Sequence, residues 1–232
     1  RRWSWSDDHF NGCNCGGSHR EGSILSLLDY LHSFRRVHHS GRFIVMFPIL
    51  GIMASQISGH LTAPSDYESI ATVTVGTAVS SITFSSIAAD WKHLQIRGIG
   101  HWSGTANTYA NGQVQLNGDT GSNYAYHRLY GNGSAASADA STSTTKMNTP
   151  WFPDDTYSNT FGSIIIDILD YSSTNKYKTI RSLGGFDGNG SGLVGLFSGL
   201  WMNTAAVTSF TISLPSYNLT TYSQLALYGI KG

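Results

Sequence analysis

The chain has 232 residues, which is long enough for one all-β domain with a sizeable core or for two small domains. Charged residues make up only 12% while Gly numbers 26 and Tyr 12, so the surface consists largely of Ser, Thr, Asn and Gly, a composition typical of extracellular and virion β-proteins and unusual for a cytosolic enzyme. The formal net charge is zero and the β-rich part has no basic cluster, which argues against nucleic-acid binding.

Residues 1–52 differ in composition from the rest of the chain. They hold six Arg, no Lys, five of the nine His and both Cys, without any alternation of apolar and polar residues. We expect a leader that forms no packed core and is poorly structured or partly helical, with the helical pattern over 23–37. The next segment, "MASQISG", resembles an initiator methionine, Met53, followed by small residues. Residues 1–52 are therefore interpreted as upstream sequence or an over-extended gene start.

Two other interpretations of the leader stay open. A secretory signal would use three arginines before the apolar run 43–54, although Pro48 interrupts that run. A transmembrane segment is less favoured, because the run is too short to span a bilayer. We therefore predict no membrane partner.

Strand patterns follow at short intervals after an N-terminal arm over 53–68. Gly76, Thr77 and Ala78 join the first two patterns as a hairpin or a tight corner. About ten strands without a convincing helix predict an all-β fold over 69–232, a two-sheet antiparallel β-sandwich with jelly-roll-like connections. The patterns lie over 69–75, 79–84, 93–100, 113–118, 123–131, 161–171, 176–185, 193–203, 206–214 and 222–230.

Residues 131–160 interrupt this series. The segment is rich in Ser, Thr and Ala, and it contains Pro150 and Pro153. We predict a long loop here, and loops of this length in compact domains are either functional or mobile.

The stretch "FGSIIIDILDYSSTNKYKTIRSLGG" predicts a β-hairpin whose turn is "SSTN". Alternation along the first strand places Asp167 and Asp170 on opposite faces, which is the wrong arrangement for two carboxylates that share one substrate bond. We expect them to pair across the hairpin with Lys176, Lys178 or Arg181.

No sequence motif for catalysis or for a cofactor is present. The chain lacks a G-x-S-x-G elbow, an H-E-x-x-H pair, a P-loop and a dinucleotide fingerprint. Cys13 and Cys15 make a poor zinc site even with His9 and His19, because a second cysteine pair is missing. Four later histidines are not at metal-ligand spacing: His60, His93, His101 and His127. We predict no catalytic residue, no metal site and no cofactor.

Aromatic residues in expected loops are the candidate ligand-binding residues. Flat rings stack against sugars, and neighbouring Asn, Asp and Ser side chains bond hydroxyls. Trp102 and Tyr109 lie in "HWSGTANTYANG", and Trp151 and Tyr157 lie in the segment 131–160. For the latter pair, anchoring of the loop on the sandwich stays open as an alternative. Trp91 and Trp201 lie in or beside strand patterns and are assigned to the core.

From Tyr67 to Gly232 the sequence resembles a family of tailed-phage structural proteins, frequent in marine and cyanobacterial phages and described as virion structural or tail-fibre proteins. The resemblance rests on "YESIATVTV", "VSSITFSSIAADWKHLQIRG", "LNGDTGSNYAYHRLYGNGS", "FGSIIIDILDYSSTNKYKTIRSLGGFD", "GLFSGLWMNTAAVTSFTISL" and "YSQLALYGIKG". It implies a component of the virion and gives no catalytic or binding residue.

We therefore expect a non-enzymatic structural protein of the virion, in a tail fibre, an appendage or a capsid decoration. Its expected partners are copies of itself and other virion proteins. The alternative is a carbohydrate- or receptor-binding module at a fibre tip, whose partner would be a host-surface glycan. A polysaccharide depolymerase is the enzyme alternative.

Overall fold

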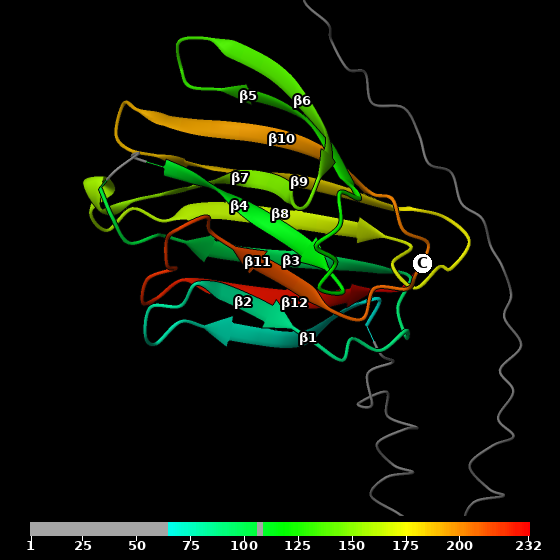
Figure 1. The fold of residues 1–232 in the computed structure, drawn as a ribbon. Coiled ribbons are helices and arrows are strands. Elements are labelled where there is room, and N and C mark those ends of the chain that lie inside the picture. The colour runs from blue at the N-terminus through cyan, green and yellow to red at the C-terminus, as the bar shows by residue number, and fades with distance from the viewer. Residues whose placement is uncertain (1–64, 106–108) are drawn as a thin grey trace, which may run out of the picture. The chain divides into compact units, whose positions relative to one another are not determined.

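The computed structural model describes residues 65–105 and 109–232, which form two antiparallel β-sheets (Figure 1). The larger sheet has the strand order β1 (Tyr67–Thr74), β12 (Gln224–Ile230), β3 (His93–Gly100), β8 (Gly162–Leu169), β9 (Lys178–Asp187), β10 (Gly192–Trp201), β5 (Tyr124–Gly131) and β6 (Ala136–Thr144). The smaller sheet has the order β2 (Ser81–Phe84), β11 (Phe210–Ser213), β4 (Tyr109–Leu116) and β7 (Met147–Pro153). One 3-10 turn, η1 (Asp155–Tyr157), follows β7.

The core lies between the two sheets. Alternate residues of each central strand are buried, such as Ile164, Ile166 and Ile168 in β8. Trp201 is buried in this core and Trp91 packs against it, which confirms their assignment. Figure 1 shows the smaller sheet in front of the larger one, with β5 and β6 extending past β7. The predicted two-sheet β-sandwich is confirmed.

The segment between β1 and β2 is a corner rather than a hairpin. β1 pairs with β12 in the larger sheet, whereas β2 pairs with β11 in the smaller one. Gly76, Thr77 and Ala78 therefore carry the chain from one sheet to the other. β1 begins at Tyr67, so the last two residues of the expected arm 53–68 already belong to the sandwich.

The predicted long loop over 131–160 is wrong, because most of it forms β6 and β7. Alternation is hard to recognise in β6, since its residues are Ala, Ser, Thr and one Asp, and nearly all are exposed. Pro150 and Pro153 argued against a strand, but β7 is an edge strand of the smaller sheet, where a residue without a backbone N–H is tolerated.

The β8–β9 hairpin is confirmed, and Asp167 lies opposite Arg181 in its register. The Arg181 guanidinium donates to Asp167 at 2.7 Å, while Asp170 forms ion pairs with Lys176 and Lys92. Lys178 has a different role from the one expected. Its ammonium donates to three main-chain carbonyls instead of a carboxylate.

The leader 1–52, with Cys13 and Cys15, and the arm residues before 65 lie outside the described residues. Over the described ranges, no helix has the length and apolar character needed to cross a membrane. Within those same ranges, no three His, Cys, Asp or Glu side chains converge on a point where a metal ion would fit.

Candidate functional site

Trp102 was expected in an exposed loop, but the structure places it in the core. Its side chain is fully buried, its indole N–H donates to the carbonyl oxygen of Phe152 at 2.9 Å, and its ring contacts Tyr217 with the centroids 3.9 Å apart. The prediction that this ring faces a ligand is wrong. The buried indole satisfies its polar atom on the main chain, as tryptophan does in a core.

Trp151 and Tyr157 anchor the segment after β6 on the larger sheet. Trp151 lies in β7 and is 4% exposed, with its ring against Phe197 at a centroid distance of 5.3 Å. Tyr157 lies in η1, and its ring packs on Phe186 at 5.2 Å. The anchoring alternative is therefore the one the structure supports for both residues.

Tyr109 begins β4 and keeps 40% of its surface exposed. Its ring meets Trp151 edge-on, with the centroids 6.4 Å apart and the planes at 83°. Among the four predicted residues, the structure thus brings Tyr109 and Trp151 into contact. Trp102 and Trp151 are buried and Tyr157 is partly buried, so Tyr109 is the exposed residue of the four.

The outer face of the larger sheet carries an unexpected row of large apolar side chains. The register places Leu196 of β10 directly between Leu129 of β5 and Leu183 of β9, and Leu183 opposite Ile165 of β8. These four side chains are 36–56% exposed. We call Leu129, Leu196, Leu183 and Ile165 the outer row. Large exposed apolar patches on soluble proteins mark interaction sites.

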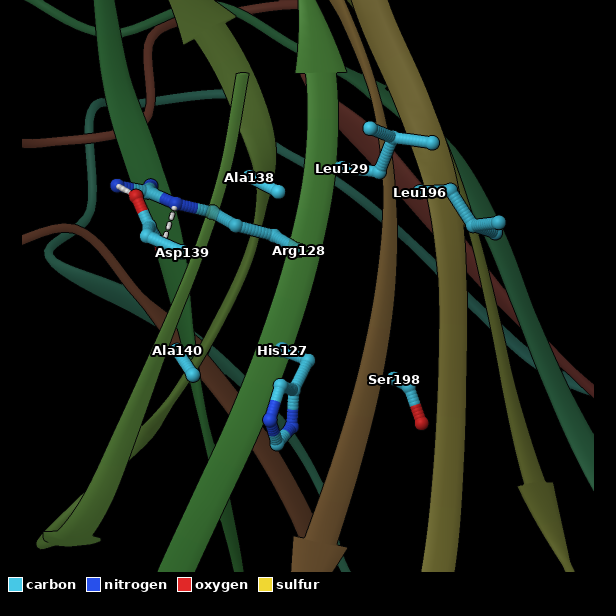
Figure 2. Close-up of a pocket in the computed structure, with 8 residues that line it drawn as sticks. All are labelled: His127, Arg128, Leu129, Ala138, Asp139, Ala140, Leu196 and Ser198. Atoms are coloured by element: carbon cyan, nitrogen blue, oxygen red, sulfur yellow. Dashed lines mark hydrogen bonds and ion pairs between the residues drawn. The ribbon is translucent and has the colours of Figure 1, made fainter.

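One end of the outer row lies in a shallow depression of about 480 Å³. Figure 2 shows Leu129 and Leu196 on adjacent strands at this depression, with Ala138 of β6 beside them. Arg128 points away from the outer row and bonds Asp139 with two hydrogen bonds of 2.7 Å. This pair joins β5 to β6 and fixes the backbone that presents Leu129.

A polar network flanks the outer row on the same face. Asp167 accepts from Arg181 and, at 2.7 Å, from the amide of Gln95. The oxygen of that amide accepts from Arg97 at 2.7 Å and from the Tyr67 hydroxyl at 3.0 Å. An apolar centre with a polar rim is the anatomy of a protein–protein interface.

The two edges of the larger sheet are less suited to pairing with another chain than its face. β6 is bulged between the residues that pair with Tyr124 and Tyr126, and it carries the inward-directed Asp139. β1 is bulged between Ser69 and Ala71. Bulges and inward charges are devices that protect sheet edges from association. The outer row has no comparable charged residue among its members.

His101 is the buried histidine of the described residues. Its Nε2 lies 2.9 Å from the carbonyl oxygen of Asp154, and its Nδ1 lies 3.2 Å from the Thr220 hydroxyl. Because a carbonyl oxygen only accepts, Nε2 donates to Asp154, while the Thr220 hydroxyl also lies 3.2 Å from the main-chain carbonyl oxygen of His101, to which it donates. Both nitrogens thus hold the segment after β3 in place, a structural arrangement.

Asp170 is the carboxylate with the largest electrostatic perturbation near the β8–β9 turn. Hydrogen bonds from the Lys176 and Lys92 ammonium groups hold its pKa at about 2. Its folded pKa is depressed, so this stabilisation is present above the ordinary value of 3.8 and is lost as the pH falls through about 2. A carboxylate that stays ionised beside two cations suits a fixed turn rather than proton transfer.

Comparisons of the chain with protein-family models, with curated proteins and with solved structures gave no match.

The sequence contained a signal for the outer row that the strand patterns did not bring out. β8 has Ile165 and Leu169 on its outer face, and β10 has Val194 and Leu196 there, while the inner face of each strand is also apolar. Strands that are apolar on both faces are typical of sheets covered on both sides. What remained unknown was the register, which aligns the outer positions of four strands into one row.

Proposed function

We propose that this chain is a non-enzymatic structural protein of a phage particle that associates with a second copy of itself through the outer face of the larger sheet. The observation that carries the proposal is the outer row, in which four neighbouring strands place Leu or Ile at one level of an exposed face. The resemblance to tailed-phage structural proteins and the low content of charged residues support a place in the virion.

A second copy suits this face because the face is self-complementary. In a two-fold arrangement the same patch serves both partners, so an apolar row meets an apolar row. Eight strands about 4.8 Å apart and about 27 Å long give a face of roughly 900 Å². A standard interface buries about 800 Å² on each partner, so the available area is sufficient.

The side chains of the outer row would supply the favourable free energy of association. Burying the exposed half of four such side chains contributes about 3 to 6 kcal/mol before the entropic cost of association is subtracted. The network of Arg181, Asp167 and Gln95 would then remain at the rim, where ion pairs contribute orientation more than affinity.

The test is the mass of the full chain in solution, with Leu196→Asp as the disruptive variant. Leu196 is 48% exposed in the single chain, so we expect an aspartate there to leave the fold intact while it places a charge within the outer row, between Leu129 and Leu183. Thr83→Asp is the matched control, because Thr83 is exposed on β2 of the other sheet.

We expect the wild-type chain and Thr83→Asp to form a dimer in sedimentation equilibrium. We expect Leu196→Asp to raise the dimer dissociation constant by about a hundredfold or more. A wild-type chain that stays monomeric at high concentration, or a dimer that Leu196→Asp does not weaken, would exclude this interface.

A further inference from the structure

A shallow groove lies on the outward side of the smaller sheet, between β4, β7 and the segment after β11. Its volume is about 220 Å³. Tyr109, Asn111 and Gln113 project into it from alternate positions of β4, and Asn148 and Tyr217 line its other side. We call this surface the Tyr109 groove.

The two tyrosines of the Tyr109 groove are held from below by aromatic side chains of the interior. Tyr109 rests edge-on against Trp151 and also contacts Phe186, with the centroids 6.0 Å apart. Tyr217 rests on the buried Trp102 at a centroid distance of 3.9 Å. Rings that are braced in this way lose little conformational entropy when a ligand stacks on them.

The asparagine amides of the Tyr109 groove are oriented by β7 of the smaller sheet and by β5 of the larger sheet. Asn111 donates to the carbonyl oxygen of Thr149 at 2.8 Å and accepts from Arg128 at 3.3 Å. Asn148 donates to the Tyr126 hydroxyl at 2.9 Å. Each side-chain amide has two N–H donors and two acceptor lone pairs, so each retains unused capacity toward the groove.

Gln113 supplies a third amide, and it is not engaged. It lies opposite Asn148 in the β4–β7 register. Within residues 65–105 and 109–232 its main-chain carbonyl accepts from Ser213, while its side-chain amide makes no hydrogen bond. A row of amides beside fixed tyrosine rings presents donors and acceptors next to a flat apolar surface.

We propose that the Tyr109 groove binds a neutral saccharide. A sugar ring has an apolar C–H face that stacks on an aromatic ring, and it has hydroxyls that both donate and accept, as side-chain amides do. None of the described residues that line the groove is charged. Arg128, which contacts Asn111 from β5, is already paired with Asp139, so its charge is neutralised rather than offered to an acidic sugar. The small volume fits a ligand that lies across the surface with one side in solvent.

This proposal is independent of self-association, because the Tyr109 groove and the outer row lie on different sheets. A dimer that forms through the outer row would leave both grooves open. Two grooves in one assembly would increase the apparent affinity for a polymeric surface glycan through the effective concentration of the second site.

The test uses the full chain and an array of neutral oligosaccharides of hexoses and N-acetylhexosamines, next to matched oligosaccharides that carry sialic or uronic acid. Binding is then quantified by calorimetric titration with the neutral oligosaccharide that gives the strongest signal. Tyr109→Ala removes the stacking ring and Gln113→Ala removes the unengaged amide. Tyr177→Ala is the control, because Tyr177 is an exposed tyrosine in the β8–β9 connection, directly before β9 of the larger sheet.

We expect neutral oligosaccharides to bind in preference to the acidic ones. Affinity should fall about tenfold or more in Tyr109→Ala and about threefold to tenfold in Gln113→Ala, and it should not change in Tyr177→Ala. If Tyr109→Ala lowers the stability of the fold, Gln113→Ala still tests the proposal, because the Gln113→Ala protein should unfold at the same temperature as the wild type.

Three results would overturn the proposal. They are no binding of neutral oligosaccharides at millimolar concentration, selective binding of the acidic ones, and binding that neither groove variant weakens. Leu196→Asp separates the two proposals, because a monomer made by that variant should still bind the saccharide with unchanged intrinsic affinity.

Discussion

Lys178 is fully buried, and the hydrogen bonds of its ammonium within residues 65–105 and 109–232 go to main-chain carbonyls rather than to a carboxylate. Its ammonium donates to the carbonyl oxygens of Ser173 at 2.6 Å, Lys176 at 3.0 Å and Thr204 at 3.1 Å. Burial lowers its pKa, with a further contribution from the Lys176 charge. The side chain thus ties the β8–β9 turn to the segment that follows β10.

Lys178→Met should destabilise the fold, because methionine fills the space and leaves three carbonyls without their donor. An unsatisfied buried polar group costs about 1 to 3 kcal/mol, so a loss in this range is expected in urea unfolding. Lys176→Met is the control and should cost less than about 1 kcal/mol, because it removes only an exposed ion pair. Equal losses in the two variants would contradict the role assigned to Lys178.

We expect ionisation of Tyr124 to lower the free energy of unfolding as the pH rises in the alkaline range. It is fully buried, its hydroxyl accepts from the Leu116 N–H at 2.9 Å, and burial raises its pKa from 10.0 to about 12. The folded pKa is above the unfolded one, so the stabilisation is complete below pH 10 and is lost as the pH rises to about 12.

Tyr124→Phe removes this ionisation while it keeps the ring in the core. Over the same pH interval the wild type should lose about 2 to 3 kcal/mol more than Tyr124→Phe, since each pKa unit corresponds to about 1.4 kcal/mol. The measurement is urea unfolding of both proteins across that interval. Parallel pH profiles for the two proteins would show that Tyr124 stays neutral or is not responsible.

The sequence predicted the role of a residue where that role depends on apolar–polar alternation along a strand or on pairing within a hairpin. The hairpin predicted Lys176, Lys178 or Arg181 as partners of Asp167 and Asp170, and the register then placed Arg181 opposite Asp167. The carbonyl partners of Lys178 did not follow, because Thr204 belongs to a segment that only the folded structure brings near. Trp102 was misassigned for the same reason, since Phe152 and Tyr217 are distant from it in the sequence.

At the scale of the elements, the β8–β9 hairpin depends on a close approach of its strands at Gly184. A Cβ at this position would lie 2.2 Å from the carbonyl oxygen of Ser163 in β8, so a side chain would force the strands apart. Gly76 in the corner between β1 and β2 has nothing within 4 Å of an added Cβ.

Gly184→Ala should therefore destabilise the protein by about 1 to 3 kcal/mol, as overpacking does. Gly76→Ala should be neutral or slightly stabilising, because it only reduces the freedom of the unfolded chain. Thermal unfolding of the two variants and the wild type checks this difference. A Gly184→Ala protein that melts with the wild type would mean that the strands can separate without cost.

The elements that the sequence predicted are those with a strong apolar period of two. β3, β8 and β10 bury alternate large residues, so their patterns specify both strand and face. β6 lacks this signal because it is an edge strand, and its small side chains are nearly all exposed instead of alternating between the core and solvent. β7 lacks this signal because its last five residues are all buried. Such a run has no apolar–polar alternation, so the sequence does not distinguish it from a loop that packs on the core.

For the whole molecule, the two sheets present different surfaces. The larger sheet carries the outer row, and the smaller sheet carries the Tyr109 groove. Only Tyr109 and Trp151 of this second surface were identified from the sequence, because the amide row requires the β4–β7 register and Tyr217 comes from a segment after β11. Self-association through one sheet and attachment through the other would give a particle component with two separate functions.

The central claim, that the outer faces of two copies meet, is tested most directly by mixing Leu196→Asp with Leu196→Lys. Each variant alone should be monomeric at low salt, because like charges would meet across the two-fold axis. An equimolar mixture should recover the dimer mass in sedimentation equilibrium, since the apposed faces then carry opposite charges. If the mixture stays monomeric, or if each variant alone dimerises as well as the wild type does, the outer row is not the interface.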